Sequence, residues 1–354
     1  MSSNTDSAPV RTGEELDVEA LRAYLNAAFG AEGPSLEIRQ FPGGHSNLTY
    51  LIRYQSNDFV LRRPPVGPVA PTAHDMPREY KLLKAVHPRF PLAPKPLLLC
   101  DDIEVIGVPF YLMERRRGVI VRSSVPPGIG ADRNLRRGVS EAVVETLVKL
   151  HAVEIEESGI VKLGKPIGFV SRQVDGWAKR WERSNTSDLP QMEEVIQWLR
   201  ERLPLDDGEG ASIVHNDFKL DNVMLNEHEP ARVVAVLDWE MSTVGDPLID
   251  VGLFLAYWTM KGTETNSSLC AITNGPGWLT REEIIDLYEK ATDRDLSRIV
   301  FYETFARFKV AVVIQQIYFR YVRGQTRDER FANLDVMVKQ LAQDALELAQ
   351  RSAI

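Results

Sequence analysis

The chain changes character at about residue 115, and this change limits the folds that it can adopt. Before that point, three short runs rich in β-branched and aromatic residues follow one another: LEIRQF, NLTYLIRY and FVLRR, with PGGHS and QSND between them. This pattern is typical of consecutive antiparallel strands joined by hairpin turns. After that point, apolar residues recur mainly at helical spacing. We therefore expect an α+β protein with a small strand-rich part and a larger helical part.

The remaining elements follow from the same spacing rules. One helix is expected at 14–29 and a second, after a proline-rich loop, at 78–86. The runs PLLLC and VPFYLME then complete a five-stranded antiparallel sheet. Further helices are expected at 131–152, 168–184, 190–203, 246–260, 280–291 and as a long pair from 295 onward, with short strands at 212–238.

These elements predict two lobes. We expect a flexible arm at 1–13, an N-terminal lobe at 14–114, a hinge at 115–119 and a helical C-terminal lobe at 120–354. Since clefts between domains are favoured ligand sites, we expect the functional site at the junction of the two lobes.

Composition excludes several classes of protein. A net charge of -8 argues against a general nucleic-acid binder, which is usually basic. Two distant cysteines, Cys100 and Cys270, indicate neither a disulfide framework nor a zinc cluster. The first residues lack the apolar core of a signal peptide, and no apolar run is long enough for a membrane span. We therefore expect a cytoplasmic protein without a nucleic-acid or membrane partner.

Polar residues are concentrated at 213–226, IVHNDFKLDNVMLN, between two apolar runs that read as short buried strands. His215, Asp217 and Asn222 follow the spacing H-x-D-x-x-x-x-N, and Asp238 comes after the next strand. Phosphoryl transfer needs such a set, because one Asp accepts the proton of the attacking hydroxyl while Asn and a second Asp hold Mg²⁺. We expect Asp217 to be the base, with Lys219 reaching the transferring phosphate and His215 supporting the loop.

The strand-rich part offers groups for a nucleotide. The turn before the second strand could supply backbone donors to phosphates, and its candidate residues are Gly43, Gly44, His45, Ser46 and Asn47. Arg62 on the third strand is expected to face the phosphates, held by Glu79 on the following helix. For the adenine ring, we expect Val60 and Leu225 on its two faces and the segment after Met113 at its edge.

HNDFKLDN at 215–222 and LDWEMSTVGDPLIDVG at 237–252 resemble the aminoglycoside phosphotransferase family of the protein-kinase-like fold. The resemblance implies ATP, with GTP as an alternative, and Mg²⁺ held by Asn222 and Asp238. It also implies that Asp250 braces the catalytic loop and that Asp246 and Glu240 have structural or metal-related roles. Two departures from the kinase pattern are the turn at 42–47, which is not G-x-G-x-x-G, and Arg62, where most kinases have Lys.

The acceptor is expected to be a small molecule. Asp246 follows Asp238 by only eight positions, with no D-F-G or A-P-E motif and no room for an activation segment that docks a polypeptide. The basic, Trp-containing stretch at 171–184 favours an anionic acceptor, although a core helix with a solvated basic face would have the same pattern. The candidate acceptor residues are Arg172, Trp177, Arg180, Trp181, Glu240 and Tyr318.

The segments FVLRRPP, GWAKRW and VGDPLIDVG are similar in sequence to the kinase-like domains that are joined to acyl-CoA dehydrogenases in family members ten and eleven. That resemblance implies phosphorylation of a hydroxyacyl-CoA, and because no dehydrogenase segment follows residue 354 we expect a stand-alone kinase. Two alternatives stay open: an aminoglycoside or other antibiotic phosphotransferase, and a nucleotide-binding pseudokinase. The basic helix disfavours the first, and the intact Asp217, Asn222 and Asp238 disfavour the second.

Overall fold

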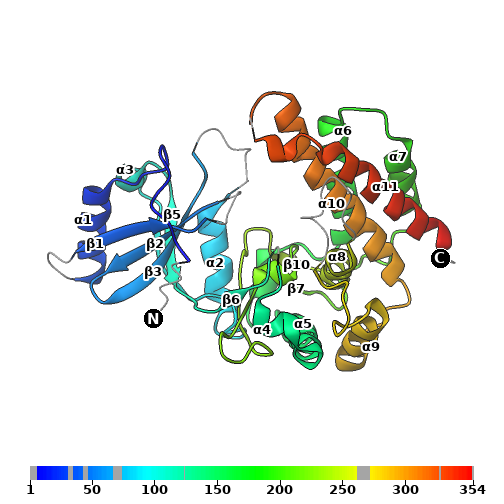
Figure 1. Cartoon of the computed structure of the whole chain (residues 1–354), viewed down its shortest axis with the longest axis horizontal. Helices are drawn as coiled ribbons and strands as arrows, with labels where there is room; N and C mark the ends of the chain where they lie inside the picture. Colours follow the sequence, from blue (N-terminus) through cyan, green and yellow to red (C-terminus); the bar gives the residue numbers. More distant parts are fainter. Residues whose placement is uncertain are drawn as a thin grey trace. The chain divides into compact units, whose positions relative to one another are not determined.

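The structure is a computed structural model that describes residues 6–30, 35–42, 47–66, 74–122, 124–260, 272–326 and 328–352 (Figure 1). The chain divides into two compact units. The first unit comprises Met1–Arg117 and Ala235–Glu240, and the second comprises Gly118–Val234 and Met241–Ile354.

The first unit is built on a five-stranded antiparallel sheet with the strand order β1-β2-β3-β5-β4. Its strands are β1 (Leu36–Gln40), β2 (Leu48–Tyr54), β3 (Asn57–Arg63), β4 (Pro96–Cys100) and β5 (Phe110–Glu114). Its helices are α1 (Val18–Phe29), α2 (Met76–Val86) and α3 (Ile103–Ile106). This sheet and the helical second unit confirm the expected α+β fold class.

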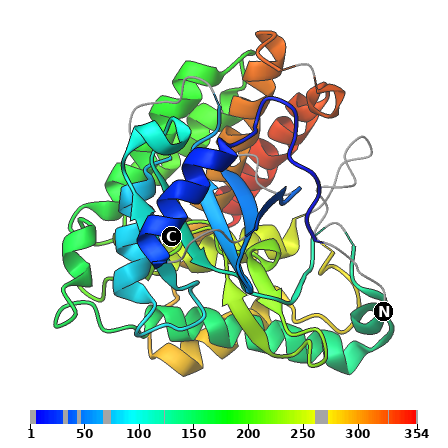
Figure 2. The same cartoon turned by 90° about the vertical axis from the view of Figure 1, so that its left-hand side faces the viewer.

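The two faces of the sheet carry different residues because side chains alternate along each strand. Tyr50, Leu61 and Leu112 are register neighbours on one face, and they join Leu21 and Leu25 of α1 in a single apolar cluster. Figure 2 shows α1, in dark blue, crossing in front of the strands. This face is therefore the core of the first unit.

The opposite face carries Val60, Arg62 and Tyr111 and faces α2. The ring of Tyr80 on α2 meets the edge of Tyr111, with the ring centroids 6.2 Å apart. Glu79 of the same helix reaches Arg62. Helix α2 thus brings a buried carboxylate to the centre of β3.

A segment distant in sequence, Ala235–Glu240, belongs to the first unit. The N–H of Val236 donates to the carbonyl oxygen of Leu92 at 2.8 Å, and Trp239 packs on Phe90 with the ring centroids 6.1 Å apart. Asp238 lies between these two attachments, so its position relative to β3 is well defined.

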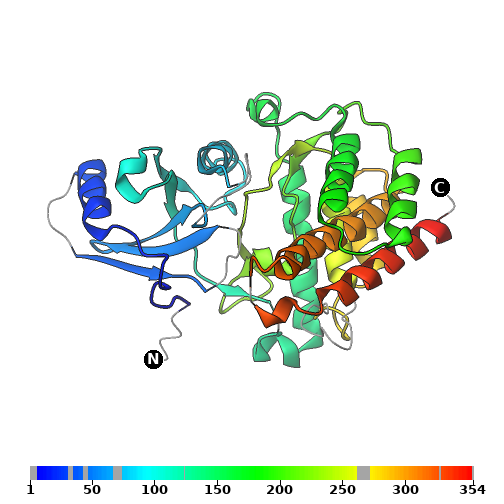
Figure 3. The same cartoon turned by 90° about the horizontal axis from the view of Figure 1, so that it is seen from above.

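The second unit is mainly helical. Its helices are α4 (Pro127–Ala131), α5 (Arg133–His151), α6 (Phe169–Ser184), α7 (Pro190–Glu201), α8 (Leu248–Thr259), α9 (Arg281–Thr292), α10 (Ile299–Val322) and α11 (Leu334–Arg351). Helix α10 is the central one, since it packs against α6, α8 and α11. Figures 1 and 3 show α10, in orange, alongside α11, in red.

Short strands accompany these helices: β6 (Val119–Ile120), β7 (Ser212–Val214), β8 (Val223–Leu225), β9 (Val233–Val236) and β10 (Thr243–Gly245). Strand β7 pairs antiparallel with β10, and β6, β8 and β9 form a three-stranded sheet. The loop from β7 to β8 is the polar segment that the sequence singles out.

The helix boundaries lie within a few residues of those expected from sequence. One difference concerns α1, which begins at Val18 and not at residue 14. Asp17 is the cause, because its side chain accepts a hydrogen bond from the N–H of Ala20 at 2.9 Å and caps the helix. Among the described residues, no helix has the length and apolar character needed to cross a membrane.

Candidate active site

The loop between β7 and β8 is fixed by the carboxylate of Asp250, in the first turn of α8. Its two oxygens accept hydrogen bonds from successive backbone N–H groups, those of His215 at 2.6 Å and Asn216 at 2.7 Å. The carbonyl oxygen of His215 accepts a further bond from the Ser242 hydroxyl at 3.3 Å. A buried carboxylate that accepts two N–H groups restrains the loop immediately before Asp217.

Asp217 is held by two side chains of its own loop. The amide of Asn222 donates to the backbone carbonyl of Asp217 at 2.8 Å and to Oδ2 at 3.0 Å. The ammonium of Lys219 lies 3.0 Å from the same Oδ2. The Asp217 side chain is 23% exposed, so its carboxylate is both oriented and accessible. These are the requirements for a general base.

Lys219 remains charged although it is largely buried. Burial by itself would lower the pKa of Lys219, but Tyr257, Asp217 and Asp221 outweigh this effect and raise it. The ammonium lies 4.9 Å from the centroid of the Tyr257 ring on α8. Burial raises the pKa of the Tyr257 phenol, and the neighbouring Asp217 adds to that rise. Asp217 therefore has one fixed cation and one neutral phenol beside it.

Asp250 has support of its own from α5 and α9. His151 on α5 lies with Nε2 3.3 Å from Asp250 Oδ2 and with Nδ1 2.7 Å from the hydroxyl of Tyr288. Burial lowers the pKa of His151, more than Asp250 raises it, so the imidazole is neutral at pH 7. Nearby, Asp246 accepts hydrogen bonds from the N–H of Leu248 and from the hydroxyl of Tyr302, which attaches the start of α8 to α10.

In the first unit, Arg62 lies between carboxylates. Its guanidinium is 3.2 Å from Glu79 Oε1, 3.0 Å from Asp238 Oδ1 and 3.8 Å from Glu240 Oε2. Burial opposes its charge, but Glu79 first, and Tyr111, Asp238 and Glu240 after it, raise the pKa of Arg62. Arg62 is therefore a permanent cation that contacts the expected metal ligand Asp238.

Asn47 and Glu240 are linked in the same unit. The Asn47 amide donates to Glu240 Oε2 at 2.6 Å, and His74 Nδ1 lies 2.8 Å from the amide oxygen of Asn47. The backbone of Glu240 also accepts from Arg78 at 3.1 Å. Glu240 is thus grouped with Arg62 and Asn47, whereas the other expected acceptor residues lie in the second unit.

The other residues expected to bind the nucleotide are found as follows. Val60 on β3 and Met113 on β5 are cross-strand neighbours, and Leu225 is buried on β8 of the second unit. Gly43, Gly44, His45 and Ser46 lie outside the described residues. Their role in binding phosphates stays a prediction.

The donor chemistry fits a magnesium ion. Both N–H groups of the Asn222 amide point to Asp217 oxygens, which leaves the amide oxygen for another partner. Asp238 has a left-handed backbone, with φ of 67°, and its side chain is 37% exposed. Hard oxygen donors of these two kinds suit Mg²⁺, which takes few protein ligands and keeps its remaining contacts to water and phosphate. Among the described residues no group of three His, Cys, Asp or Glu side chains forms a ready metal site.

Trp177 on α6 is flanked by two cations. The guanidinium of Arg180 lies 4.6 Å from the centroid of its ring, and the ammonium of Lys309 on α10 lies 5.3 Å from it. Burial, together with the neighbouring Arg183, lowers the pKa of Arg180. Part of the predicted basic and aromatic group is thus assembled, and Lys309 is an addition to it.

The other expected acceptor residues have different surroundings. Trp181 is 2% exposed and donates its indole N–H to Glu193 on α7 at 3.1 Å, so it serves to pack α6 against α7. Arg172 donates to the carbonyl oxygens of Lys165 and Ile167 at the start of α6. Tyr318 is half-buried on α10. Trp181 and Arg172 therefore have structural contacts that occupy their donor groups.

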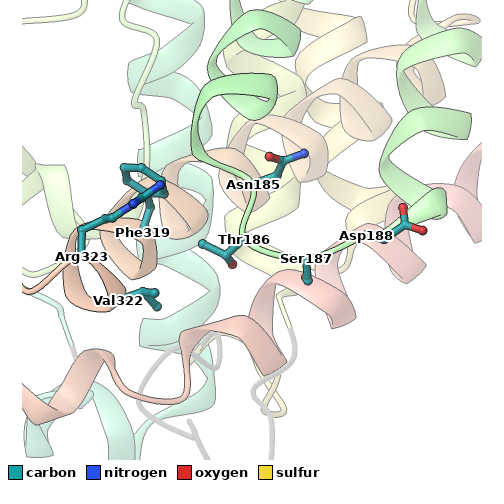
Figure 4. Close-up of a pocket in the computed structure, with 7 residues that line it drawn as sticks. All are labelled: Asn185, Thr186, Ser187, Asp188, Phe319, Val322 and Arg323. Carbon is teal, nitrogen blue, oxygen red and sulfur yellow. The ribbon is translucent and has the colours of Figure 1, made fainter.

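A cavity of about 590 Å³ opens at the C-terminal ends of α6 and α10. It is lined by Asn185, Thr186, Ser187, Asp188, Phe319, Val322 and Arg323 (Figure 4). Gln315 connects α10 to the end of α6, because its amide donates to the Ser184 carbonyl at 2.7 Å and to the Thr186 hydroxyl at 3.0 Å. Arg323 stacks over Phe319, with 5.1 Å between its guanidinium carbon and the ring centroid.

Sequence reasoning did not single out Tyr257 and Lys309, which lie near Asp217, or His151, which contacts Asp250. Lys309 had a usable signal, since it is the one charged residue in FKVAVVI, a stretch of continuous apolar character. Tyr257 had none, because an aromatic residue in an apolar helix is usually part of the core.

The chain belongs to the phosphotransferase enzyme family, which it matches over residues 37–282. Its fold is the kinase-like fold of that family. A protein of Ralstonia eutropha provisionally named an aminoglycoside phosphotransferase is 28% identical, with a TM-score of 0.82 over 96% of this chain and 100% of that one. A complex of aminoglycoside phosphotransferase APH(4)-Ia with AMP-PNP and hygromycin B has the same fold at 16% identity, with a TM-score of 0.59 over 94% of this chain and 100% of that one.

Among curated proteins, the chain is 35% identical to human acyl-CoA dehydrogenase family member 11 over 98% of its length. It is 33% identical to mouse acyl-CoA dehydrogenase family member 10, also over 98%. The match covers 45% of the first protein and 32% of the second, so the chain spans less than half the length of these relatives. The similarity to acyl-CoA dehydrogenase family members ten and eleven, expected from the sequence, is confirmed.

Proposed function

We propose that the protein is an ATP- and Mg²⁺-dependent kinase that phosphorylates a hydroxyl group of a small anionic metabolite, best represented by a hydroxyacyl-CoA. The observation that carries this proposal is the environment of Asp217. Its carboxylate is accessible, is held by Asn222 and Lys219, and lies on a loop whose backbone is anchored to Asp250.

In the proposed reaction, Asp217 accepts the proton of the acceptor hydroxyl. The hydroxyl oxygen bonds to the terminal phosphorus while the bond from that phosphorus to the nucleoside diphosphate breaks. Lys219 supplies positive charge next to the transferring group, and Arg62 supplies it for the phosphates of the nucleotide. When bound, Mg²⁺ would neutralise phosphate charge, and Asn222 and Asp238 would hold it.

Charge in the second unit supports an anionic acceptor. Arg180 is partly buried on Trp177, and among the described residues no carboxylate pairs with it. Arg183 and Arg320 are exposed, and Arg323 borders the cavity in Figure 4. Unpaired guanidinium groups favour phosphate and carboxylate ligands and disfavour the polycationic aminoglycosides.

The length of α10 supports an extended acceptor. Lys309, close to the base, and Phe319, in the cavity, are ten residues apart, which on an α-helix corresponds to about 15 Å. A CoA thioester could place its hydroxyl near Asp217 and its phosphates near the basic residues of α6 and α10. The names of the curated relatives, which refer to acyl-CoA, agree with this assignment.

An antibiotic phosphotransferase is the second candidate, and the similarity to the Ralstonia eutropha protein favours it. A mass-spectrometric screen with ATP and Mg²⁺ separates the two candidates. The acceptors are hydroxyacyl-CoAs, the matching acyl-CoAs without the hydroxyl, aminoglycosides and choline-like amino alcohols, with Asp217→Asn as the blank.

A phosphate gain on the hydroxyacyl-CoA alone is the expected result. A gain on an aminoglycoside would overturn the acceptor assignment but not the base. If no acceptor gains phosphate although ATP binds, the result favours a nucleotide-binding pseudokinase over the proposed kinase.

A further inference from the structure

Lys309 is a buried cation without a carboxylate partner among the described residues. It lies in the middle of α10, is 4% exposed, and is surrounded by buried residues of the same helix such as Phe305, Phe308 and Val312. Its ammonium donates to the carbonyl oxygen of Asn216 at 2.6 Å and lies over the Trp177 ring. A buried, unpaired ammonium costs free energy, so its presence needs a reason beyond packing.

The bond partner of Lys309 is the residue immediately before Asp217. Asn216 has a φ of 64°, in the left-handed region that residues other than glycine seldom occupy. Three groups from separate segments hold it in this conformation. Its N–H donates to Asp250, its side-chain amide donates to the carbonyl oxygen of Met241 at 3.1 Å, and its carbonyl oxygen accepts from Lys309. Strained residues that several contacts hold in place are common at functional sites.

The charge of Lys309 also acts on the base. Burial is the largest influence on this ammonium and lowers the pKa of Lys309 to about 8. Of the charged groups that face it, Asp217 acts most strongly and Asp250 next, both favouring the cation, whereas Lys219 and Arg180 oppose it. Lys309 is therefore mainly protonated at pH 7, close to Asp217.

We infer that Lys309 is a positioning residue for phosphoryl transfer, which fixes the Asn216–Asp217 peptide through its hydrogen bond and supplies a buried positive charge beside the base. This inference rests on the proposed function. Lys309 does not touch the reacting atoms. Its effect is to keep the Asp217 carboxylate aligned with the acceptor hydroxyl, and a displacement of about 1 Å at such a position can cost about 100-fold in rate.

The test compares Lys309→Met, which removes the donor and the charge, with Lys309→Arg, which keeps both. Lys339→Met on α11 is the matched control, because Lys339 is an exposed lysine paired with Asp335.

For Lys309→Met we expect a kcat about 100-fold lower than that of wild type and a nucleotide Kd within twofold of the wild-type value. We expect Lys309→Arg to recover at least about tenfold of that loss, and Lys339→Met to behave as wild type. If Lys309→Met does not fold, Lys309→Gln takes its place. Because Gln keeps a donor and loses only the charge, we expect its kcat to lie between that of Lys309→Arg and the roughly 100-fold loss expected for Lys309→Met.

A kcat within threefold of wild type for folded Lys309→Met would overturn the inference. Equal activity of folded Lys309→Met and Lys309→Arg would overturn it as well, because retention of the charged donor would then have no effect.

Hydrogen exchange gives a readout that does not depend on turnover. In Lys309→Met, peptides that cover 213–222 are expected to take up deuterium faster than in wild type, and in Lys309→Arg they are expected to be close to wild type. If the wild-type protein transfers phosphate to no acceptor, the proposed function fails. Lys309 is still tested in that case, since unchanged exchange in Lys309→Met would overturn the inference independently.

Discussion

Arg62 on β3 and Glu79 on α2 form a buried ion pair, with 3.2 Å between Nη1 and Oε1 and side chains that are 9% and 2% exposed. The pair joins the sheet to α2 on the face away from the main apolar cluster. Because Asp238 also contacts Arg62, the pair fixes the residue that we expect to bind Mg²⁺.

Arg62→Met should therefore destabilise the protein strongly. It leaves the carboxylate of Glu79 buried without its cation, and loss of one partner of a buried pair typically costs about 3–5 kcal/mol. Arg53→Met on β2 is the control, because Arg53 pairs with Glu37 on the surface and such pairs contribute about 0–1 kcal/mol. Urea unfolding of the two variants measures the difference, and equal losses would contradict the structural role given to Arg62.

Gly252→Ala tests the close contact between α8 and α10. An added Cβ would lie 2.5 Å from the backbone carbonyl group of Tyr302, so the two helices would have to separate. We expect a loss of about 1–3 kcal/mol in stability and, because α8 carries Asp250, a lower kcat. Gly128→Ala on α4 is the control, since nothing lies within 4 Å of its added Cβ. Thermal unfolding and steady-state kinetics of both variants provide the test. Equal stability and equal kcat of Gly252→Ala and Gly128→Ala would contradict the close contact between α8 and α10.

Lys309 should make stability depend on pH in the alkaline range. Its pKa is about 8 in the folded chain, below the ordinary value of 10.5, so between these values the unfolded chain binds more protons than the folded one. The contribution of Lys309 to the free energy of unfolding therefore rises by about 3 kcal/mol as the pH increases through that interval. Below pH 8, the destabilisation caused by burying the charged ammonium is fully present. The measurement is the unfolding free energy of wild type minus that of Lys309→Met at pH 7.5 and at higher pH. A difference that stays flat would show that the pKa of Lys309 is ordinary, and one that falls with pH would show that its pKa is raised; either result would contradict the prediction.

The acceptor proposal predicts a selective effect of the basic residues. Arg323→Ala and Arg180→Met should raise KM for a CoA thioester about tenfold or more, since a charge-assisted hydrogen bond to phosphate contributes about 1.5–3 kcal/mol, while KM for ATP stays the same. Arg351→Ala on α11 is a suitable control because Arg351 forms an exposed pair with Glu347. Initial rates with each substrate varied in turn provide the test. Equal changes in both KM values would place these residues outside the acceptor site.

Much of the fold could be predicted from the sequence because its elements have strong local signals. The runs LEIRQF, NLTYLIRY and FVLRR alternate as strands do, and α2 and α9 begin at clear capping residues, Asp75 and Thr280. The short elements were missed. Helix α3 has only four residues between Asp102 and Gly107, and β10 has three, so neither has a periodicity to detect.

The candidate site was only partly predictable, for a related reason. Asp217, Lys219 and Asn222 share one loop, and their spacing reveals them. Lys309 reaches Asn216 from 93 residues away, and only the packing of α10 on the rest of the unit brings the two together. Trp177 and Trp181 share a face of α6, but the sequence could not tell that Glu193 would take the indole of Trp181.

The central claim is that Asp217 acts as the base of a phosphotransferase. The most direct test is to measure nucleotide binding and phosphoryl transfer for Asp217→Asn alongside wild type. The account predicts a nucleotide Kd within about twofold of wild type and a transfer rate lower by a factor of about 100 to 10,000, because Asn keeps the shape but cannot accept the proton. Transfer at the wild-type rate by folded Asp217→Asn would contradict it.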